Sequence, residues 1–157
     1  MTSIGAVTTR RTVLASSVVL PLGLLAACGS DDGAKATDTD DAVRSSVASD
    51  EHLLIEQYNA VIAAFPSLSA KLTPIRDQHQ QHLSAMKTPA PSATASPSPA
   101  PTSQSSAISM LTSAERKAAA TRTDSCVQAT KQDLVWTLSL IAASEASHAA
   151  SLSGLAG

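Results

Sequence analysis

Apolar residues recur every three or four positions along four stretches of this chain, which is the spacing of one face of an α-helix. The stretches cover about residues 43–65, 67–87, 106–129 and 130–154. Since such faces must be buried, the pattern predicts four amphipathic helices packed around one core. The fourth stretch is the clearest, with apolar residues at Leu134, Leu138, Ile141, Leu152 and Leu155.

The connections between these stretches differ in length. Pro66 and Ser67 make a short first turn, and the third and fourth helices are almost contiguous, whereas residues 88–106 form a long Pro/Ser/Ala-rich link. Proline at this density excludes a helix, and short connections join antiparallel neighbours. We therefore expect an all-α, antiparallel four-helix bundle in which 88–106 is a disordered crossover. Pro74 either kinks the second helix or follows Thr73 as an N-cap.

Carboxylate and imidazole side chains interrupt all four apolar faces. A buried group of this kind needs a partner, a proton or a metal ion. At about 1.5 Å of rise per residue, the polar positions of each hairpin lie level with one another when counted from its turn. The pattern predicts a buried polar site, and its candidate metal ligands are Glu51, His79, His82, Glu115, Glu145 and His148.

Each of these residues also has an ordinary structural explanation. Glu51 would suit a first helical turn, and residues 112–115 (Thr-Ser-Ala-Glu) fit a capping box. The two histidines of the second helix would be half-exposed at a frayed end, and Glu145 would form a private ion pair with His148. Residues 130–133 resemble a capping box that begins the fourth helix. A metal-binding interior and a metal-free polar core both remain open.

The N-terminal residues 1–27 indicate an export signal. Two arginines precede an apolar run over residues 13–25, which is short for a membrane span. Residues 25–28, Leu-Ala-Ala-Cys, resemble the lipobox of bacterial lipoproteins. That resemblance implies cleavage before Cys28 and lipid on its sulfur, which would hold the chain on the outer face of the cytoplasmic membrane. An ordinary cleaved signal is the alternative. Residues 9–14 also resemble a twin-arginine signal, which exports folded proteins.

Residues 28–42 are predicted to be the lipidated cysteine and a flexible acidic stalk, because residues 29–42 are small, polar and rich in aspartate. The helical domain then covers 43–157. With Cys28 committed to lipid, Cys126 is expected to be a buried free thiol. The formal net charge is −2 and there is no basic patch, so nucleic acid is not an expected partner.

The chain resembles the ferritin-like superfamily, and within it small actinobacterial ferritin-like lipoproteins of undefined function. The resemblance covers about residues 45–153 and implies a metal site lined by carboxylates and imidazoles. It rests on the short motifs Glu51-His52-Leu53-Leu54 with Tyr58, the His79/His82 segment, Ala114-Glu115-Arg116 and, above all, Ser144-Glu145-Ala146-Ser147-His148-Ala149.

One helix departs from that family pattern. In di-iron members, two helices each supply one glutamate and the other two each supply Glu-x-x-His. Here the second helix has His79-x-x-His82 instead. Three carboxylates do not balance two divalent ions, and imidazole favours zinc, copper or a single iron over harder ions. The expected cofactor is one transition metal (zinc, copper, iron or manganese), and a bridged di-iron oxidase is disfavoured.

Two functions therefore fit the sequence. One is a lipid-anchored metal-binding bundle of the cell envelope. The other is a non-enzymatic envelope lipoprotein that binds a protein or cell-wall partner, with a vestigial polar core. Trp136 lies off the apolar face, so it either packs at a helix seam or marks a contact surface. There is no phosphate loop, nucleophile elbow or His-Glu-x-x-His helix, so classical hydrolase chemistry has no support. Whether the chain is an enzyme stays open.

Overall fold

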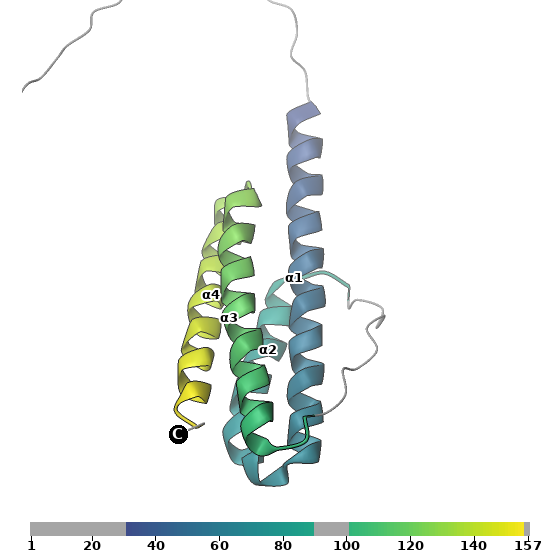
Figure 1. The fold of residues 1–157 in the computed structure, drawn as a ribbon. Helices are drawn as coiled ribbons and strands as arrows, with labels where there is room; N and C mark the ends of the chain where they lie inside the picture. The colour runs from purple at the N-terminus through teal and green to yellow at the C-terminus, as the bar shows by residue number, and fades with distance from the viewer. Residues whose placement is uncertain (1–30, 90–100, 156–157) are drawn as a thin grey trace, which may run out of the picture.

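The described part of the chain consists of four α-helices and one short 3₁₀ helix (Figure 1). This computed structural model describes residues 31–89 and 101–155, with side chains from residue 39 onward. No strand occurs among these residues, which confirms the all-α prediction. The elements in chain order are α1 (Asp31–Ala64), the 3₁₀ helix η1 (Pro66–Leu68), α2 (Ser69–Ala85), α3 (Gln104–Gln128) and α4 (Gln132–Ser153).

Several predictions on the N-terminal region and the crossover fall outside that part. The signal peptide (1–27), Cys28 and its lipid, and residues 90–100 of the predicted crossover lie outside the described residues. Within the described residues, no helix is both long and apolar enough to span a membrane.

The prediction of a flexible stalk before the first helix is wrong. We expected residues 28–42 to be flexible, but residues 31–42 are helical and continuous with the rest of α1. Asp40 is fully buried, and its carboxylate accepts hydrogen bonds from the backbone N–H (2.7 Å) and the hydroxyl (3.0 Å) of Thr130. The backbone hydrogen bond from Thr130 is the main reason that the pKa of Asp40 is lowered. This contact holds α1 against the α3–α4 turn, so the helix starts well before Val43.

The same contact explains why the capping box predicted at residues 130–133 is wrong. Thr130 gives its hydroxyl to Asp40, and α4 begins at Gln132 after Lys131, which makes no side-chain cap. The capping box that does form lies at the start of α3, where Ser103 and Ser106 each accept the other's backbone N–H at 3.2 Å. The predicted disordered segment 88–106 therefore ends early, because residues 104–106 are already helical.

Pro74 lies inside α2 and does not follow an N-cap at Thr73. The chain enters α2 directly from η1, so a full turn of helix precedes the proline. Pro74 has no N–H to donate to the carbonyl of Ala70, which leaves one helical hydrogen bond unmade. His79 and His82 nonetheless lie on one helix, one turn apart, as predicted.

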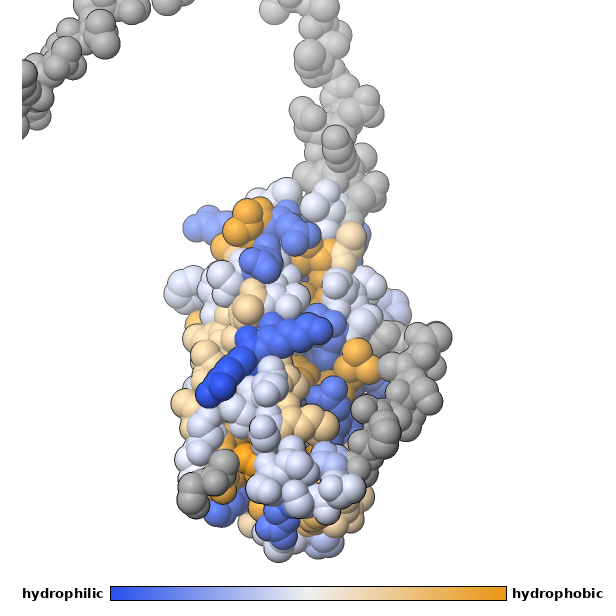
Figure 2. All heavy atoms as spheres, viewed as in Figure 1, coloured by the Kyte–Doolittle hydropathy of each residue, from blue (hydrophilic) through white to orange (hydrophobic). Residues whose placement is uncertain are grey.

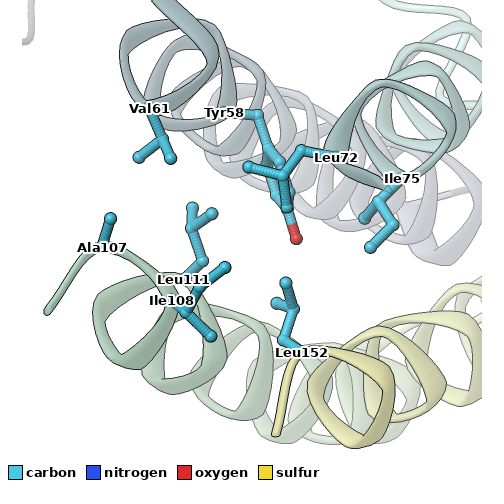
Figure 3. Close-up of a cluster of buried hydrophobic side chains, with 8 residues drawn as sticks. All are labelled: Tyr58, Val61, Leu72, Ile75, Ala107, Ile108, Leu111 and Leu152. Carbon is cyan, nitrogen blue, oxygen red and sulfur yellow. The ribbon is translucent and has the colours of Figure 1, made fainter. Parts of the chain in front are cut away.

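Two apolar clusters fill the interior of the bundle. The first lies toward η1 and includes Tyr58, Leu72 and Leu111, which converge with five other side chains in Figure 3. The second includes Val47 and Leu138 and lies toward the α3–α4 turn. The polar positions of each helix come between the two clusters along the chain. On the outside, the face in Figure 2 mixes hydrophilic and hydrophobic residues over the described helices.

Leu138 and Leu140 offer a matched test of this packing, because they lie on the same helix but differ in burial. Leu138 has no exposed surface, whereas Leu140 is 55% exposed. We expect Leu138→Ala to lower the free energy of unfolding by about 2–5 kcal/mol and Leu140→Ala to change it by less than about 0.5 kcal/mol. Urea titration followed by circular dichroism measures both. Equal losses for the two variants would contradict the assignment of the core face of α4.

Candidate metal centre

The six predicted metal ligands come together in the layer between the two apolar clusters. Two groups of ligand atoms form there, and the atoms of each group all lie within 4.8 Å of one another. One group combines Glu51 of α1, His79 and His82 of α2, and Glu145 of α4, and the other combines His79, Glu115 of α3 and His148 of α4. The predicted convergence is confirmed, and the role of these side chains as ligands remains a prediction.

His79 lies at the centre of the layer and belongs to both groups. Its Nδ1 lies 2.8 Å from Glu51 Oε2, and its Nε2 lies 2.8 Å from Glu115 Oε1. Carboxylate oxygens accept, so both ring nitrogens donate and the ring is an imidazolium in this arrangement. Burial opposes that charge, but the hydrogen bonds to Glu115 and Glu51 outweigh it and raise the pKa of His79 to about 9.

The pKa values of the three buried glutamates do not all shift in the same direction. Burial alone would raise the pKa of Glu51, but the hydrogen bond from His79 and the nearby His82 ring lower it to about 2. The pKa of Glu115 is also lowered to about 2, since the nearby His148 ring and the hydrogen bond from His79 outweigh its burial. Burial dominates for Glu145 and, with the neighbouring carboxylate charges, raises its pKa to about 8. The metal-free layer thus holds two ionised glutamates and one protonated glutamate at neutral pH.

Tyr58 completes the surroundings of Glu115. Its hydroxyl donates a hydrogen bond to Glu115 Oε1, the same oxygen that accepts from His79. Burial, followed by the negative charge of Glu115, raises the pKa of Tyr58, so the phenol keeps its proton and stays a donor. The other oxygen, Glu115 Oε2, has no hydrogen-bond partner.

Arg122 is a member of the layer that was not among the predicted site residues. It is fully buried, with Nη1 2.9 Å from Asp50 Oδ2, Nη2 3.4 Å from Glu51 Oε1 and Nε 3.3 Å from Glu145 Oε1. Its position on the same helical face as Glu115 was the available signal. A basic residue at an inward position implies buried acidic partners.

Gln78 is a second member that the sequence reasoning missed. Its Oε1 lies 2.9 Å from Nε2 of His148 and 3.2 Å from the donating hydroxyl of Ser144. An amide oxygen accepts, so His148 carries its proton on Nε2 when neutral, and the lone pair of Nδ1 faces the interior. Outer contacts of this kind orient imidazoles that bind metals. Because Gln78 is exposed on α2, no inward periodicity indicated it.

Unpartnered atoms provide the test of whether a metal fits. Five buried atoms of the predicted ligands have no hydrogen-bond partner: both carboxylate oxygens of Glu145, Oε2 of Glu115, and Nδ1 of His82 and of His148. Buried polar atoms without partners are costly, so each calls for an explanation. All five are ligand atoms for a transition metal. The residues present therefore fit a metal ion.

The structural alternatives for these residues are mostly wrong. Glu51 is not in a first turn, because α1 begins at Asp31. Glu115 is not a helix-start residue, since α3 begins at Gln104. Glu145 and His148 form no private pair: Glu145 faces Arg122, and His148 contacts Gln78 and faces Glu115. The two histidines of α2 were the candidates for half-exposed residues at a frayed helix end. This explanation is wrong for His79, which is fully buried, and only His82 has some of its side chain exposed, 13%.

Cys126 and Trp136 complete the comparison with the sequence. Cys126 is a free thiol, as expected, but it is only partly buried, and its sulfur lies 3.7 Å from the carbonyl oxygen of Val135. Trp136 is 67% exposed, so it does not pack at a seam between helices.

Comparison of this chain with protein-family models, with curated proteins and with solved structures finds no match. What the fold and the site define is a class: an all-helical bundle with a buried Glu/His cluster that could hold a metal ion.

Proposed function

We propose that this chain is a lipid-anchored protein of the bacterial cell envelope whose ferritin-like bundle binds a transition metal in the Glu/His layer. The observation that carries the proposal is the convergence of five unpartnered carboxylate and imidazole atoms in the interior. In a metal-free layer these atoms make no hydrogen bond, and Glu145 Oε1 and Glu115 Oε2 only face Arg122 Nε and His148 Nδ1 at 3.3 Å and 3.5 Å. One ion would contact several of them at once. The candidate ligands are Glu51, His79, His82, Glu115, Glu145 and His148.

The helix arrangement supports the ferritin-like part of the proposal. Helix α1 packs against α2, and α3 against α4. The start of α3 contacts η1, since Gln104 Nε2 donates to Ser67 Oγ at 2.8 Å. Met86, which follows α2, instead packs in the second cluster with Val43 and Leu134, at the opposite end. The end of α2 and the start of α3 therefore lie at opposite ends of the bundle, as a bundle with one long crossover requires.

The donor set supports zinc, copper, iron or manganese over magnesium or calcium, because three of its six members are imidazoles. Iron, copper or manganese would add redox capacity to the site, and zinc would add Lewis acidity. The role of this chain's own residues is to hold the ion away from water. Gln78 and Ser144 orient His148, and the apolar clusters close the layer on both sides.

The envelope part of the proposal rests on the lipobox-like residues 25–28 and on the start of α1 at Asp31. Only two residues separate Cys28 from that helix, so the domain would be carried by a helix close to its anchor instead of a flexible stalk. The twin-arginine-like residues 9–14 would permit export after the metal has been acquired.

Metal content of the mature protein tests the proposed function. Protein purified without chelators should carry a transition metal, and added zinc, copper, iron or manganese should raise its melting temperature. At a metal concentration of about 100 times Kd, the expected gain in unfolding free energy is about 2.7 kcal/mol. His82→Ala and Glu145→Ala should lose most of both effects. Near-zero metal together with no thermal shift by any of these ions would reject the function.

A second function is favoured by the exposed apolar side chains near the α3–α4 turn. Val127, Trp136 and Leu140 are 86%, 67% and 55% exposed, and Trp136 and Leu140 are one turn apart on α4. Exposed aromatic residues of this kind often anchor protein contacts. The chain would then be an envelope lipoprotein that binds a protein or cell-wall partner. A photo-crosslinking residue at position 136 in intact cells checks this, with the exposed Glu56 of α1 as control. Equal crosslinking at both positions would count against it.

A further inference from the structure

Arg122 carries a permanent positive charge that should repel a metal ion, yet it lies among the candidate ligands. Its guanidinium has no exposed surface and faces Glu145 at 3.3 Å and Glu51 at 3.4 Å. These two glutamates belong to the four-residue group of ligand atoms. An arginine cannot be deprotonated in a protein. Its positive charge is therefore present whatever else the layer contains.

The donor atoms by themselves do not restrict the layer to one ion. They form two groups, one of four residues and one of three, that share only His79. The two ring nitrogens of His79 face different groups, since Nδ1 contacts Glu51 and Nε2 contacts Glu115. In geometric terms each group could hold an ion of its own, so a limit on the number of ions must have another cause.

The charges supply that cause. The fully buried carboxylates of this layer are Glu51, Glu115 and Glu145, which carry −3 when all three are ionised as ligands. Arg122 contributes +1, so the remainder is −3 + 1 = −2, which one divalent ion neutralises. Two divalent ions would leave +2 in an interior of low dielectric, where uncompensated charge is costly. Asp50 changes this little, because its side chain is 40% exposed and its charge is screened by water.

We propose that Arg122 limits this site to one divalent ion by supplying the positive charge that a second ion would otherwise supply. The inference rests on the proposed metal-binding function and adds to it the number of ions and the residue that sets it. With the guanidinium, one divalent ion leaves the layer neutral and two leave +2. Without it, one ion leaves −1 and two leave +1, so the charge penalty for a second ion no longer exceeds that for a single ion. A lysine at the same position keeps the charge and should keep the limit.

The test counts Zn²⁺ ions per chain by native mass spectrometry in the unmodified protein, Arg122→Lys and Arg122→Gln, each with excess Zn²⁺ and checked by circular dichroism. We expect one ion in the unmodified protein, one in Arg122→Lys and two in Arg122→Gln. Metal-free Arg122→Gln should have lost helix content, and Zn²⁺ should restore it with two ions bound.

The other outcomes are each decisive. One ion in Arg122→Gln, two ions in the unmodified protein or two ions in Arg122→Lys would overturn the inference and leave metal binding intact. Arg122→Gln that stays unfolded with Zn²⁺ would also overturn it, because a second ion would then be unable to replace the guanidinium. An unmodified protein that binds no ion when zinc, copper, iron and manganese are each offered in excess would instead reject the proposed function itself.

Discussion

Replacing His79 with leucine should abolish metal binding and lower the free energy of unfolding of the metal-free chain by about 3–5 kcal/mol. His79 belongs to both groups of ligand atoms, so its loss removes a donor from each. It is also the positive charge between Glu51 and Glu115, at 2.8 Å from each. Leucine leaves two buried carboxylates without that partner, which costs more than the lost contacts alone.

His52→Leu is the matched control, because His52 lies on α1 beside Glu51 in sequence but outside both groups of ligand atoms. Metal content by elemental analysis and urea titration near pH 6 measure the two effects, since His79 is charged and both glutamates are ionised at that pH. A His79→Leu protein that keeps its metal, or whose stability matches that of His52→Leu, would show that His79 does not organise the layer.

The sequence sufficed to predict which side chains meet in the interior, and the reason is helical periodicity. Glu51, His79, Glu115 and Glu145 each continue an apolar face, and a face with a period near 3.6 points inward along its whole length. Counting from the turns gave the right depth because the rise per residue is nearly constant in a helix. The proline in α2 did not disturb this, since His79 lies more than one turn beyond Pro74.

Three of the failures involve contacts between residues far apart in the sequence. Residues 28–42 have the composition of a flexible segment, yet Asp40 reaches Thr130, ninety positions away, and that contact accompanies a continuous helix. The same bond removed the expected cap of α4. Arg122 shares the inner face of α3 with Glu115, but its three acidic partners lie on α1 and α4. Local patterns do not specify such partners, because they depend on how hairpins pack.

The metal-free chain should be most stable near pH 4.5 and should lose stability on either side of that pH. The pKa values of Glu51 and Glu115 are lowered from 4.5 to about 2, so the stability they contribute is present above pH 4.5 and is lost as the pH falls toward 2. His79 affects the stability at alkaline pH. Its pKa is raised from 6.5 to about 9, so its contribution is complete below pH 6.5 and is lost as the pH rises through 9.

Glu145 steepens the alkaline loss. Its pKa is raised from 4.5 to about 8, so the folded chain holds a proton that the unfolded chain releases, and stability falls as the pH rises between those values. With about 1.4 kcal/mol for each unit of pKa shift, His79 and Glu145 together should remove on the order of several kcal/mol between about pH 6 and pH 9. Urea titration in the presence of EDTA across this range measures the decline, and His79→Leu should make it shallower.

Zinc should reverse that alkaline decline. Metal ligation requires neutral imidazoles and ionised carboxylates, which are the forms of His79 and Glu145 that the metal-free interior disfavours. Affinity therefore rises with pH over the same range in which the metal-free chain weakens, and the stability maximum should move to higher pH when Zn²⁺ replaces EDTA. Both curves come from the same urea titrations. A metal-free chain that gains stability from pH 6 to 9 would contradict the charge states assigned to His79 and Glu145. Superimposable curves with EDTA and with Zn²⁺ would mean that the layer is a self-neutralised polar core, held by His79 and Arg122 alone.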